Sequence, residues 1–133
     1  ERNISFPGYK MYMNSVQAKI LMENFKTFSK KMGVLEKLVD IYNRELGYKN
    51  SSQHLYTIEV LDNEKFINNM RNAGIVCGIH YPALHKNPIY NNGVKFNCPK
   101  SEKLEKRTVS LPMNETLSLL EIEYIIDKVK ENL

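Results

Sequence analysis

The sequence predicts an α+β domain in which a small sheet of about three strands is covered by a long N-terminal helix and further helices. Apolar residues recur at steps of three and four over residues 14–47, alternate with period two over residues 54–60, and form a last helical stripe after Ser118. The chain has 133 residues, which is enough for one hydrophobic core.

The first predicted helix begins at Asn14 or Ser15, because either side chain can accept a hydrogen bond from the first N–H groups of a helix. It ends at Gly47. A straight helix over residues 14–47 would be about 50 Å long, whereas a compact chain of this size has a radius of gyration of about 14 Å. We therefore expect the helix to break near Gly33, to pack on something outside this sequence, or both.

The middle of the chain predicts two strands and a short helix. Residues 54–60 alternate and are rich in β-branched and aromatic side chains, which is typical of a strand. Asp62 is placed to cap a short helix that Gly74 closes. Residues 75–81 predict a second strand, which ends at Pro82 because proline has no N–H to donate to a neighbouring strand.

A long loop and two further helices complete the predicted domain. Residues 82–98 contain prolines, glycine and several asparagines, and long loops in compact domains often carry function. Pro99 can start a short polar helix, and residues 108–111 predict a third strand. Ser118 and Glu121 have the spacing of a capping box at the start of the last helix.

Charge, hydropathy and cysteine content argue against several classes of protein. The net charge of +4 is spread among both signs, which does not indicate a nucleic-acid-binding surface. Apolar runs are only a few residues long, so we expect no membrane span, and no signal peptide is visible. Two cysteines do not form a disulfide framework, which favours a reduced, cytoplasmic protein.

Neither a metal site nor a nucleophilic cysteine is expected. The cysteines Cys77 and Cys98 and the histidines His80 and His85 do not have the spacing of a structural zinc site. A Cys77–His80 pair would need the thiol beside the base, but the two side chains would lie on opposite faces of a regular strand.

The residues His80, Tyr81 and His85 form the most informative polar group in the chain. Two imidazoles and a phenol follow a predicted strand and open a long loop, where they could bind a polyhydroxylated or phosphorylated ligand through hydrogen bonds. The alternative is that the two histidines simply flank a turn on the surface.

Four segments resemble motifs of one protein family. Residues 8–18 (GYKMYMNSVQA) resemble its G-Y-[NK]-Y-x-M-[ST]-x-[LI]-Q-A segment, and residues 54–56 (HLY) its H-L-Y strand. Residues 74–85 resemble R-G-I-x-x-G-[VI]-H-Y-x-x-L-H, and residues 110–112 (SLP) the closing S-L-P stretch. The family is DegT/StrS, pyridoxal-phosphate (PLP) aminotransferases that act on nucleotide-linked keto sugars. The motifs occur in the family's order and span residues 8–131.

The resemblance is to the C-terminal part of the family, the small domain of fold-type I PLP aminotransferases. It implies a segment approaching the active site at residues 1–13 and the small domain at residues 14–133. The large domain, with the lysine that forms the Schiff base with PLP, has no counterpart in this sequence. We therefore expect no catalytic residue here, no PLP bound by this fragment alone and no activity of the fragment alone.

The resemblance also implies roles for individual residues. Lys10 and Tyr12 would approach the cofactor phosphate or the substrate, in many members within the neighbouring subunit of a homodimer. Lys10 is not the Schiff-base lysine, and Tyr12 stands where Asn or Arg is frequent, so its phenol would offer a hydrogen bond without a charge. The residues His80, Tyr81 and His85 would line the sugar-nucleotide pocket.

For the intact enzyme, the resemblance implies transfer of an amino group from glutamate to a keto nucleotide sugar in the synthesis of surface glycans. A 4-keto sugar is favoured over a 3-keto sugar. The alternative is a free-standing, non-catalytic α+β module that binds a sugar nucleotide or a partner protein. A small nucleic-acid-binding protein is the third interpretation, and the mixed charges disfavour it.

Overall fold

The structure is a computed structural model that describes residues 8, 10–90 and 96–133. Residues 1–7 and 9 of the predicted segment that approaches the active site (residues 1–13) lie outside the described residues, as do residues 91–95 of the predicted loop. The elements in chain order are α1 (Ser15–Phe25), α2 (Phe28–Leu46), β1 (Tyr56–Glu59), α3 (Asn63–Asn72), the 3-10 helix η1 (Leu84–Lys86), α4 (Pro99–Glu105), β2 (Thr108–Leu111) and α5 (Leu119–Asn132). In the described ranges, no helix is both long enough and apolar enough to cross a membrane.

The predicted ends of the first helical region are confirmed. Asn14 caps α1 and exchanges hydrogen bonds with Gln17, which together form a capping box. At the other end, α2 stops at Gly47, whose φ of 74° lies in the left-handed region that glycine adopts without steric cost.

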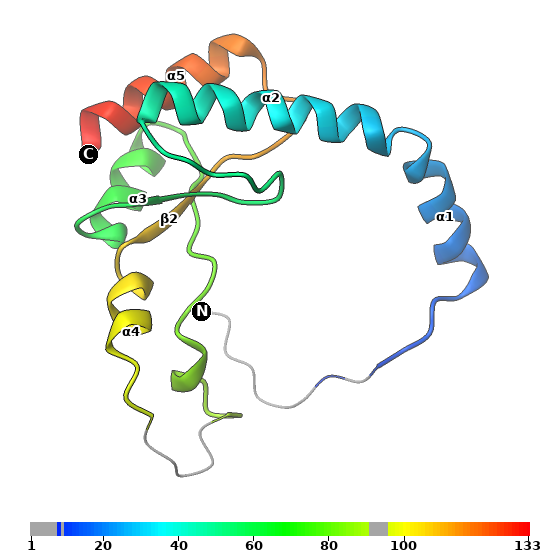
Figure 1. Cartoon of the computed structure of the whole chain (residues 1–133), viewed down its shortest axis with the longest axis horizontal. Coiled ribbons are helices and arrows are strands. Elements are labelled where there is room, and N and C mark those ends of the chain that lie inside the picture. The colour runs from blue at the N-terminus through cyan, green and yellow to red at the C-terminus, as the bar shows by residue number, and fades with distance from the viewer. Residues whose placement is uncertain (1–7, 9, 91–95) are drawn as a thin grey trace.

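The helix breaks at a different place from the one predicted. Figure 1 shows α1 turning away from α2, and the turn lies at Lys26 and Thr27, not at Gly33. The Lys26 N–H donates to the Glu23 carbonyl, and the Thr27 hydroxyl donates to the Asn24 carbonyl at 3.1 Å. These tighter local bonds replace the regular helical ladder, whereas Gly33 stays within the continuous helix α2, whose later turns pack on α5.

The sheet has two antiparallel strands, with the register Tyr56↔Leu111, Thr57↔Ser110, Ile58↔Val109 and Glu59↔Thr108. The expected strand at residues 75–81 is not formed. Only Gly78 pairs with the outer edge of β2, through two backbone hydrogen bonds to Ser110 of 3.1 and 2.7 Å. The chain leaves the sheet immediately afterwards, so this segment forms a single bridge and not a ladder.

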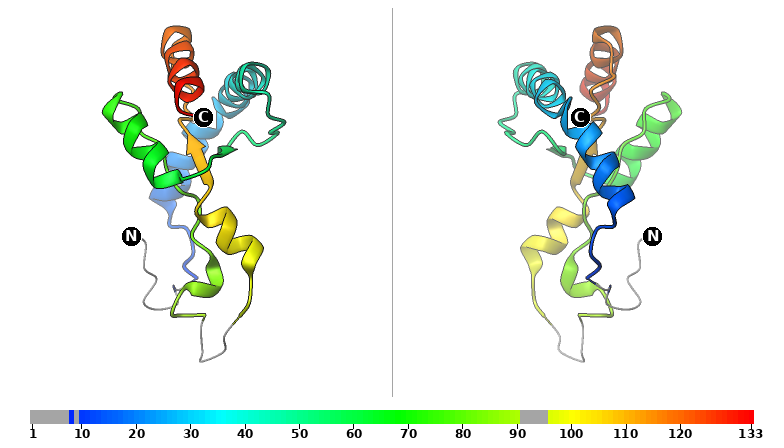
Figure 2. Two further views of the ribbon diagram at one scale, coloured as in Figure 1. Left: turned by 90° about the vertical axis from the view of Figure 1, so that its left-hand side faces the viewer. Right: turned by 90° about the vertical axis from the view of Figure 1, so that its right-hand side faces the viewer.

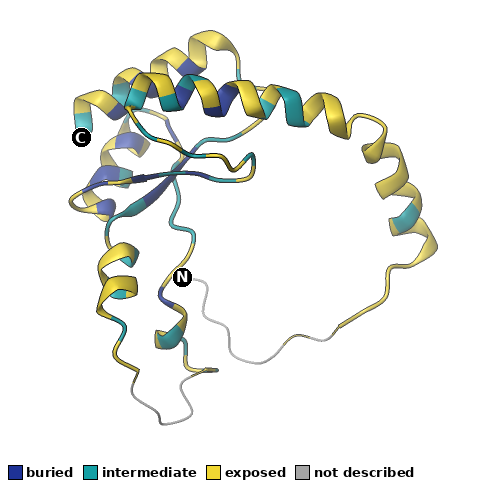
Figure 3. Ribbon diagram, in the orientation of Figure 1, coloured by how far each residue is buried: buried dark blue, intermediate teal, exposed yellow. Residues whose placement is uncertain are grey.

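Three helices cover one face of this sheet. Figure 2 shows α3, α5 and α2 fanned out on the same side of the strands, with α5 in the middle, in contact with both α2 and α3. The α5 helix begins at the predicted capping box of Ser118 and Glu121. The core consists of inward-facing apolar side chains of these helices and both strands, among them Tyr42, Tyr56, Ile58, Met70, Val109 and Val129 (Figure 3).

Two projections extend from this core. One is α1 with the segment before it, and none of its helical residues is buried, although Val16, Ile20 and Phe25 are large and apolar. The other, which we call the arm, consists of residues 76–90 and 96–106 and contains η1 and α4 (Figure 1). Since α1 finds no cover within the described chain, its apolar side chains are available to pack on another structure.

Candidate functional site

The base of the arm holds His80 against the sheet. Ser110 lies in β2 on the face opposite the helices, is only 4% exposed, and its Oγ is 3.0 Å from Nδ1 of His80. Gly78 pairs with the backbone of Ser110, so the chain passes directly beside the serine before it reaches His80. A Cβ atom at Gly78 would lie 2.8 Å from Cε1 of His80, which shows how closely the ring covers this position.

Tyr81 is the most accessible of the predicted site residues in the arm. Its ring meets that of His80 edge to face, with 5.3 Å between centroids and 83° between planes, and the residue is 61% exposed. An exposed phenol beside a half-buried imidazole offers hydrogen-bond donors and an aromatic face to a polar ligand. The structure thus places His80 and Tyr81 together.

His85 lies further along the arm and is engaged within it. Its Nε2 is 3.0 Å from Oε1 of Glu102 in α4, and its side chain is only 14% exposed. The neighbouring Lys86 forms an ion pair with Glu105, one helical turn after Glu102. The hydrogen bond from Lys86 is the main cause of the lowered pKa of Glu105. These two contacts bind η1 to α4, so His85 contributes to the shape of the arm as well as to its polar surface.

The structure does not bring the two predicted groups of site residues together. Lys10 and Tyr12 are exposed, Tyr12 to 92%, and belong to the segment before α1. Figure 1 shows this segment on the opposite side of the molecule from the arm that holds His80, Tyr81 and His85. Within one copy of the described chain they form two separate surfaces.

Ser110 and Glu102 were not identified from the sequence as functional residues. Ser110 is part of the Ser-Leu-Pro stretch, to which the family resemblance assigns no individual role. For Glu102 the available signal was its spacing of three from Glu105, which places both carboxylates on one side of a short helix. That side faces the consecutive residues His85 and Lys86.

The cysteine chemistry considered above finds no support in the geometry. Burial raises the pKa of the Cys77 thiol to about 11, so the nucleophilic thiolate is scarce near neutral pH. His80 Nδ1 is directed to Ser110. In the part of the chain that the structure describes, no three His, Cys, Asp or Glu side chains gather as a metal site would require.

The described residues do not by themselves fit PLP. Its anchoring lysine must be held in a site and able to lose its proton. Apart from Lys128, every lysine in the described ranges is exposed, including Lys10. A hydrogen bond from Lys128 to Glu131 is the main cause of the raised pKa of Lys128, which keeps the amine protonated. The described residues therefore include no lysine placed to anchor the cofactor.

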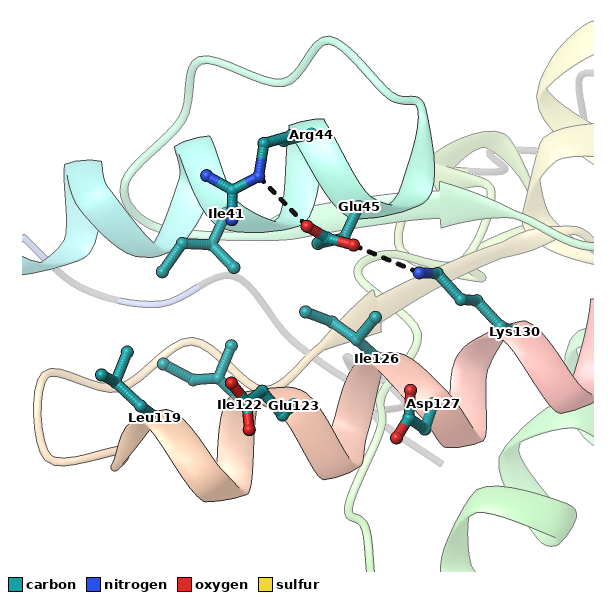
Figure 4. A pocket seen from close by; sticks show the side chains of 9 residues that line it. All are labelled: Ile41, Arg44, Glu45, Leu119, Ile122, Glu123, Ile126, Asp127 and Lys130. Atoms are coloured by element: carbon teal, nitrogen blue, oxygen red, sulfur yellow. Dashed lines mark hydrogen bonds and ion pairs between the residues drawn. The ribbon is translucent and has the colours of Figure 1, made fainter.

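A hollow of about 260 Å³ lies between α2 and α5, away from the arm. Figure 4 shows Ile41, Ile122 and Ile126 beneath a charged rim, where Arg44 and Lys130 both bind Glu45. These two hydrogen bonds lower the pKa of Glu45. Arg44, Glu45 and Lys130 are thus bonded to one another, whereas Glu123 and Asp127, which also line the hollow, form no ion pair among the described residues.

Comparison with known proteins matches residues 1–130 to the model of the DegT/DnrJ/EryC1/StrS aminotransferase family. The uncharacterized protein MJ1066 of Methanocaldococcus jannaschii is 23% identical over 145 residues, covering 93% of this chain and 38% of that protein. The dTDP-3-amino-3,6-dideoxy-alpha-D-galactopyranose transaminase of Aneurinibacillus thermoaerophilus is 31% identical over 77 residues, covering 57% of this chain and 21% of that protein.

Among solved structures, Spr1654 of Streptococcus pneumoniae in its PMP form is similar with a TM-score of 0.81 and 26% identity. The alignment covers 97% of this chain and 37% of that one. Nearly all of this chain is therefore matched, but it spans only about two fifths of the length of these two relatives.

Proposed function

Because the chain belongs to the DegT/DnrJ/EryC1/StrS aminotransferase family, we propose that it is the small C-terminal domain of an enzyme that aminates a keto nucleotide sugar. The amino donor is glutamate. The observation that carries this proposal is the family match over residues 1–130, in a chain that covers only 37–38% of full-length relatives. The A. thermoaerophilus relative, whose name is that of an amino-sugar transaminase, supports the substrate class.

In this proposal PLP is held by a part of the enzyme outside the described residues. Spr1654 has been solved in PLP and PMP forms, which supports this cofactor for the intact enzyme. When bound, the cofactor supplies the electron sink for moving the amino group. The residues of this chain bind and orient the sugar nucleotide, and the fragment alone is inactive.

The arm supplies the substrate-binding residues. His80 and Tyr81 present an imidazole and a phenol at its base, and His85 completes the polar surface beside α4. Lys10 and Tyr12 serve the cofactor phosphate or the substrate of a second subunit in a homodimer. The separation of the two surfaces in Figure 1 supports this assignment, because two sites built from different copies can use both surfaces at once.

The intact enzyme works in the cytoplasm in the synthesis of surface glycans. The amino group is added at position 4 or position 3 of the sugar. Because the name of the A. thermoaerophilus relative refers to a 3-amino sugar, both positions should be tested. The alternative is a non-catalytic module that binds a sugar nucleotide or a protein, and the exposed apolar residues of α1 would suit a protein partner.

The test is an assay of the complete protein that carries this chain, with glutamate and dTDP-linked 4-keto and 3-keto sugars. We expect an aminated sugar nucleotide, identified by mass spectrometry, and a slower reaction in His80→Ala and His85→Ala with little loss of folding. His54→Ala is the matched control, because His54 is exposed and lies before β1. Binding without amination would favour the non-catalytic module.

A further inference from the structure

The serine of the Ser-Leu-Pro stretch has a specific partner that its place in a strand does not require. Ser110 is one of two buried polar residues in the described chain, the other being Asn63. Its backbone N–H and carbonyl are both bonded to Gly78, so the hydroxyl is the only group left to satisfy. A buried hydroxyl needs a partner, and the one present is Nδ1 of His80 at 3.0 Å.

The direction of this hydrogen bond follows from the cost of leaving a donor unsatisfied. If Nδ1 of His80 carried the proton, the Ser110 hydroxyl would accept and its own hydrogen would have no partner among the described residues. If the hydroxyl donates to Nδ1, no buried donor is left over, and the ring proton must lie on Nε2. The second arrangement satisfies the buried Ser110 hydroxyl and leaves the Nε2–H of His80 as a donor for a ligand.

The ring of His80 also occupies the space that a side chain at position 78 would need. The φ of Gly78 lies outside the left-handed region, so backbone conformation does not require glycine there. The requirement is space, because a Cβ atom would approach Cε1 of His80 to 2.8 Å and Nδ1 to 3.4 Å. An added methyl group would displace the ring from Ser110.

We propose that Ser110, together with Gly78, is a positioning residue that fixes the ring orientation and tautomer of His80, so that Nε2–H points away from the sheet as a hydrogen-bond donor. Given the proposed function, which this inference extends, the acceptor is an oxygen of the sugar nucleotide, either of the diphosphate or of the sugar. Ser110 itself does not touch the substrate. Its role is to preset the donor, which lowers the entropic cost of binding.

The positioning claim is tested by ¹⁵N NMR of the three histidine rings in the 133-residue chain, at a pH where the rings are neutral. When one tautomer dominates, the ¹⁵N chemical shifts of the two ring nitrogens differ widely. Exchange between the two tautomers averages these chemical shifts and brings them closer together. For wild-type His80 we expect a wide difference between the two ¹⁵N chemical shifts, with the proton on Nε2. In Ser110→Ala and in Gly78→Ala we expect this difference to be lost.

Controls distinguish positioning from general damage to the fold. Ser110→Thr keeps the hydroxyl and should retain the wild-type pattern, and Ser101→Ala removes an exposed hydroxyl of α4 and should change nothing. A proton on Nδ1 in the wild type, or an unchanged pattern in Ser110→Ala, would overturn the proposal. If Ser110→Ala does not fold, Gly78→Ala and Ser110→Thr still decide the question.

The substrate claim is tested in the complete enzyme. We expect Ser110→Ala to raise KM for the keto nucleotide sugar up to about tenfold, with the half-reaction of the amino donor unchanged and Ser110→Thr close to wild type. An unchanged KM would overturn the link to the substrate. If the complete protein aminates no sugar, the proposed function is wrong, whereas the ring-nitrogen measurements still decide the role of Ser110.

Discussion

Replacing Asn63 should destabilise the base of the arm more than replacing an exposed residue of α3 does. Asn63 is 3% exposed, and its Nδ2 donates to the carbonyls of Glu105 at 2.7 Å and Thr108 at 3.2 Å. These bonds join the start of α3 to the end of α4 and the start of β2. Asn63→Ala leaves both carbonyls without this donor.

The magnitude follows from the two lost bonds. Each contributes about 0.5–1.5 kcal/mol net, so together they account for about 1–3 kcal/mol of unfolding free energy. The better helix propensity of alanine returns at most about 0.7 kcal/mol. We therefore expect Asn63→Ala to lower the unfolding free energy by about 1–2 kcal/mol.

The carboxylate variant Asn63→Asp separates the hydrogen bonds from side-chain volume. A negative charge at the first turn of α3 gains about 0.3–1 kcal/mol from the helix dipole, but here it would face two carbonyl oxygens in a buried site, which costs more. We expect a larger loss than for alanine at pH 7. Burial should raise the pKa of the introduced carboxyl group in the folded state, so the loss should grow as pH rises between its unfolded and folded pKa values.

Urea denaturation followed by circular dichroism measures these losses. With an m-value of about 1–3 kcal/mol/M, the alanine variant should lower the urea midpoint by roughly 0.3–2 M. Asn68→Ala is the control, since Asn68 is exposed on the same helix. A difference of less than about 0.5 kcal/mol between Asn63→Ala and Asn68→Ala would refute the assignment of a stabilising role to the two hydrogen bonds.

Three further predictions follow from burial and charge. Met70→Ala, at a fully buried core position, should cost about 2–5 kcal/mol in urea denaturation, whereas Phe25→Ala on exposed α1 should change stability by less than about 0.5 kcal/mol. The lowered pKa of Glu105 means that its ionised form stabilises the fold above its unfolded pKa, and that this contribution is lost as pH falls through the folded pKa. Glu105→Gln should therefore flatten the acid limb of a plot of unfolding free energy against pH. An equal slope in both proteins would contradict this. Because burial raises the pKa of Cys77 to about 11, mass spectrometry should find little alkylation of this thiol by iodoacetamide at pH 8 in the folded chain and full alkylation in urea.

Local signals in the sequence predicted the elements whose structure is determined locally. The caps at Asn14, Asp62 and Ser118 form as expected, because a short polar side chain and the N–H groups it binds are only a few residues apart. The strand at residues 108–111 has the predicted bounds. Its apolar residues Val109 and Leu111 face the core, which the alternating pattern records directly.

Features that depend on distant contacts were not predictable in the same way. The sequence predicts a strand over residues 75–81, but pairing requires a partner along the whole segment, and β2 pairs with it only at Gly78. The helix break at Thr27 depends on side-chain and turn hydrogen bonds that compete with the helical ladder, and helix propensity alone points to Gly33. His80 was identified, but its partner Ser110 lies 30 residues away, and no periodicity relates them.

The two-stranded sheet also bears on how this protein can change over evolution. The pairing of Glu59 with Thr108 closes a loop that contains α3 and the arm. The entropy of closing such a loop grows only with the logarithm of its length, about 0.6 kcal/mol for each doubling. The length of the arm can therefore change at little cost to the core, so new ligand preferences can arise there while the hydrophobic core stays the same.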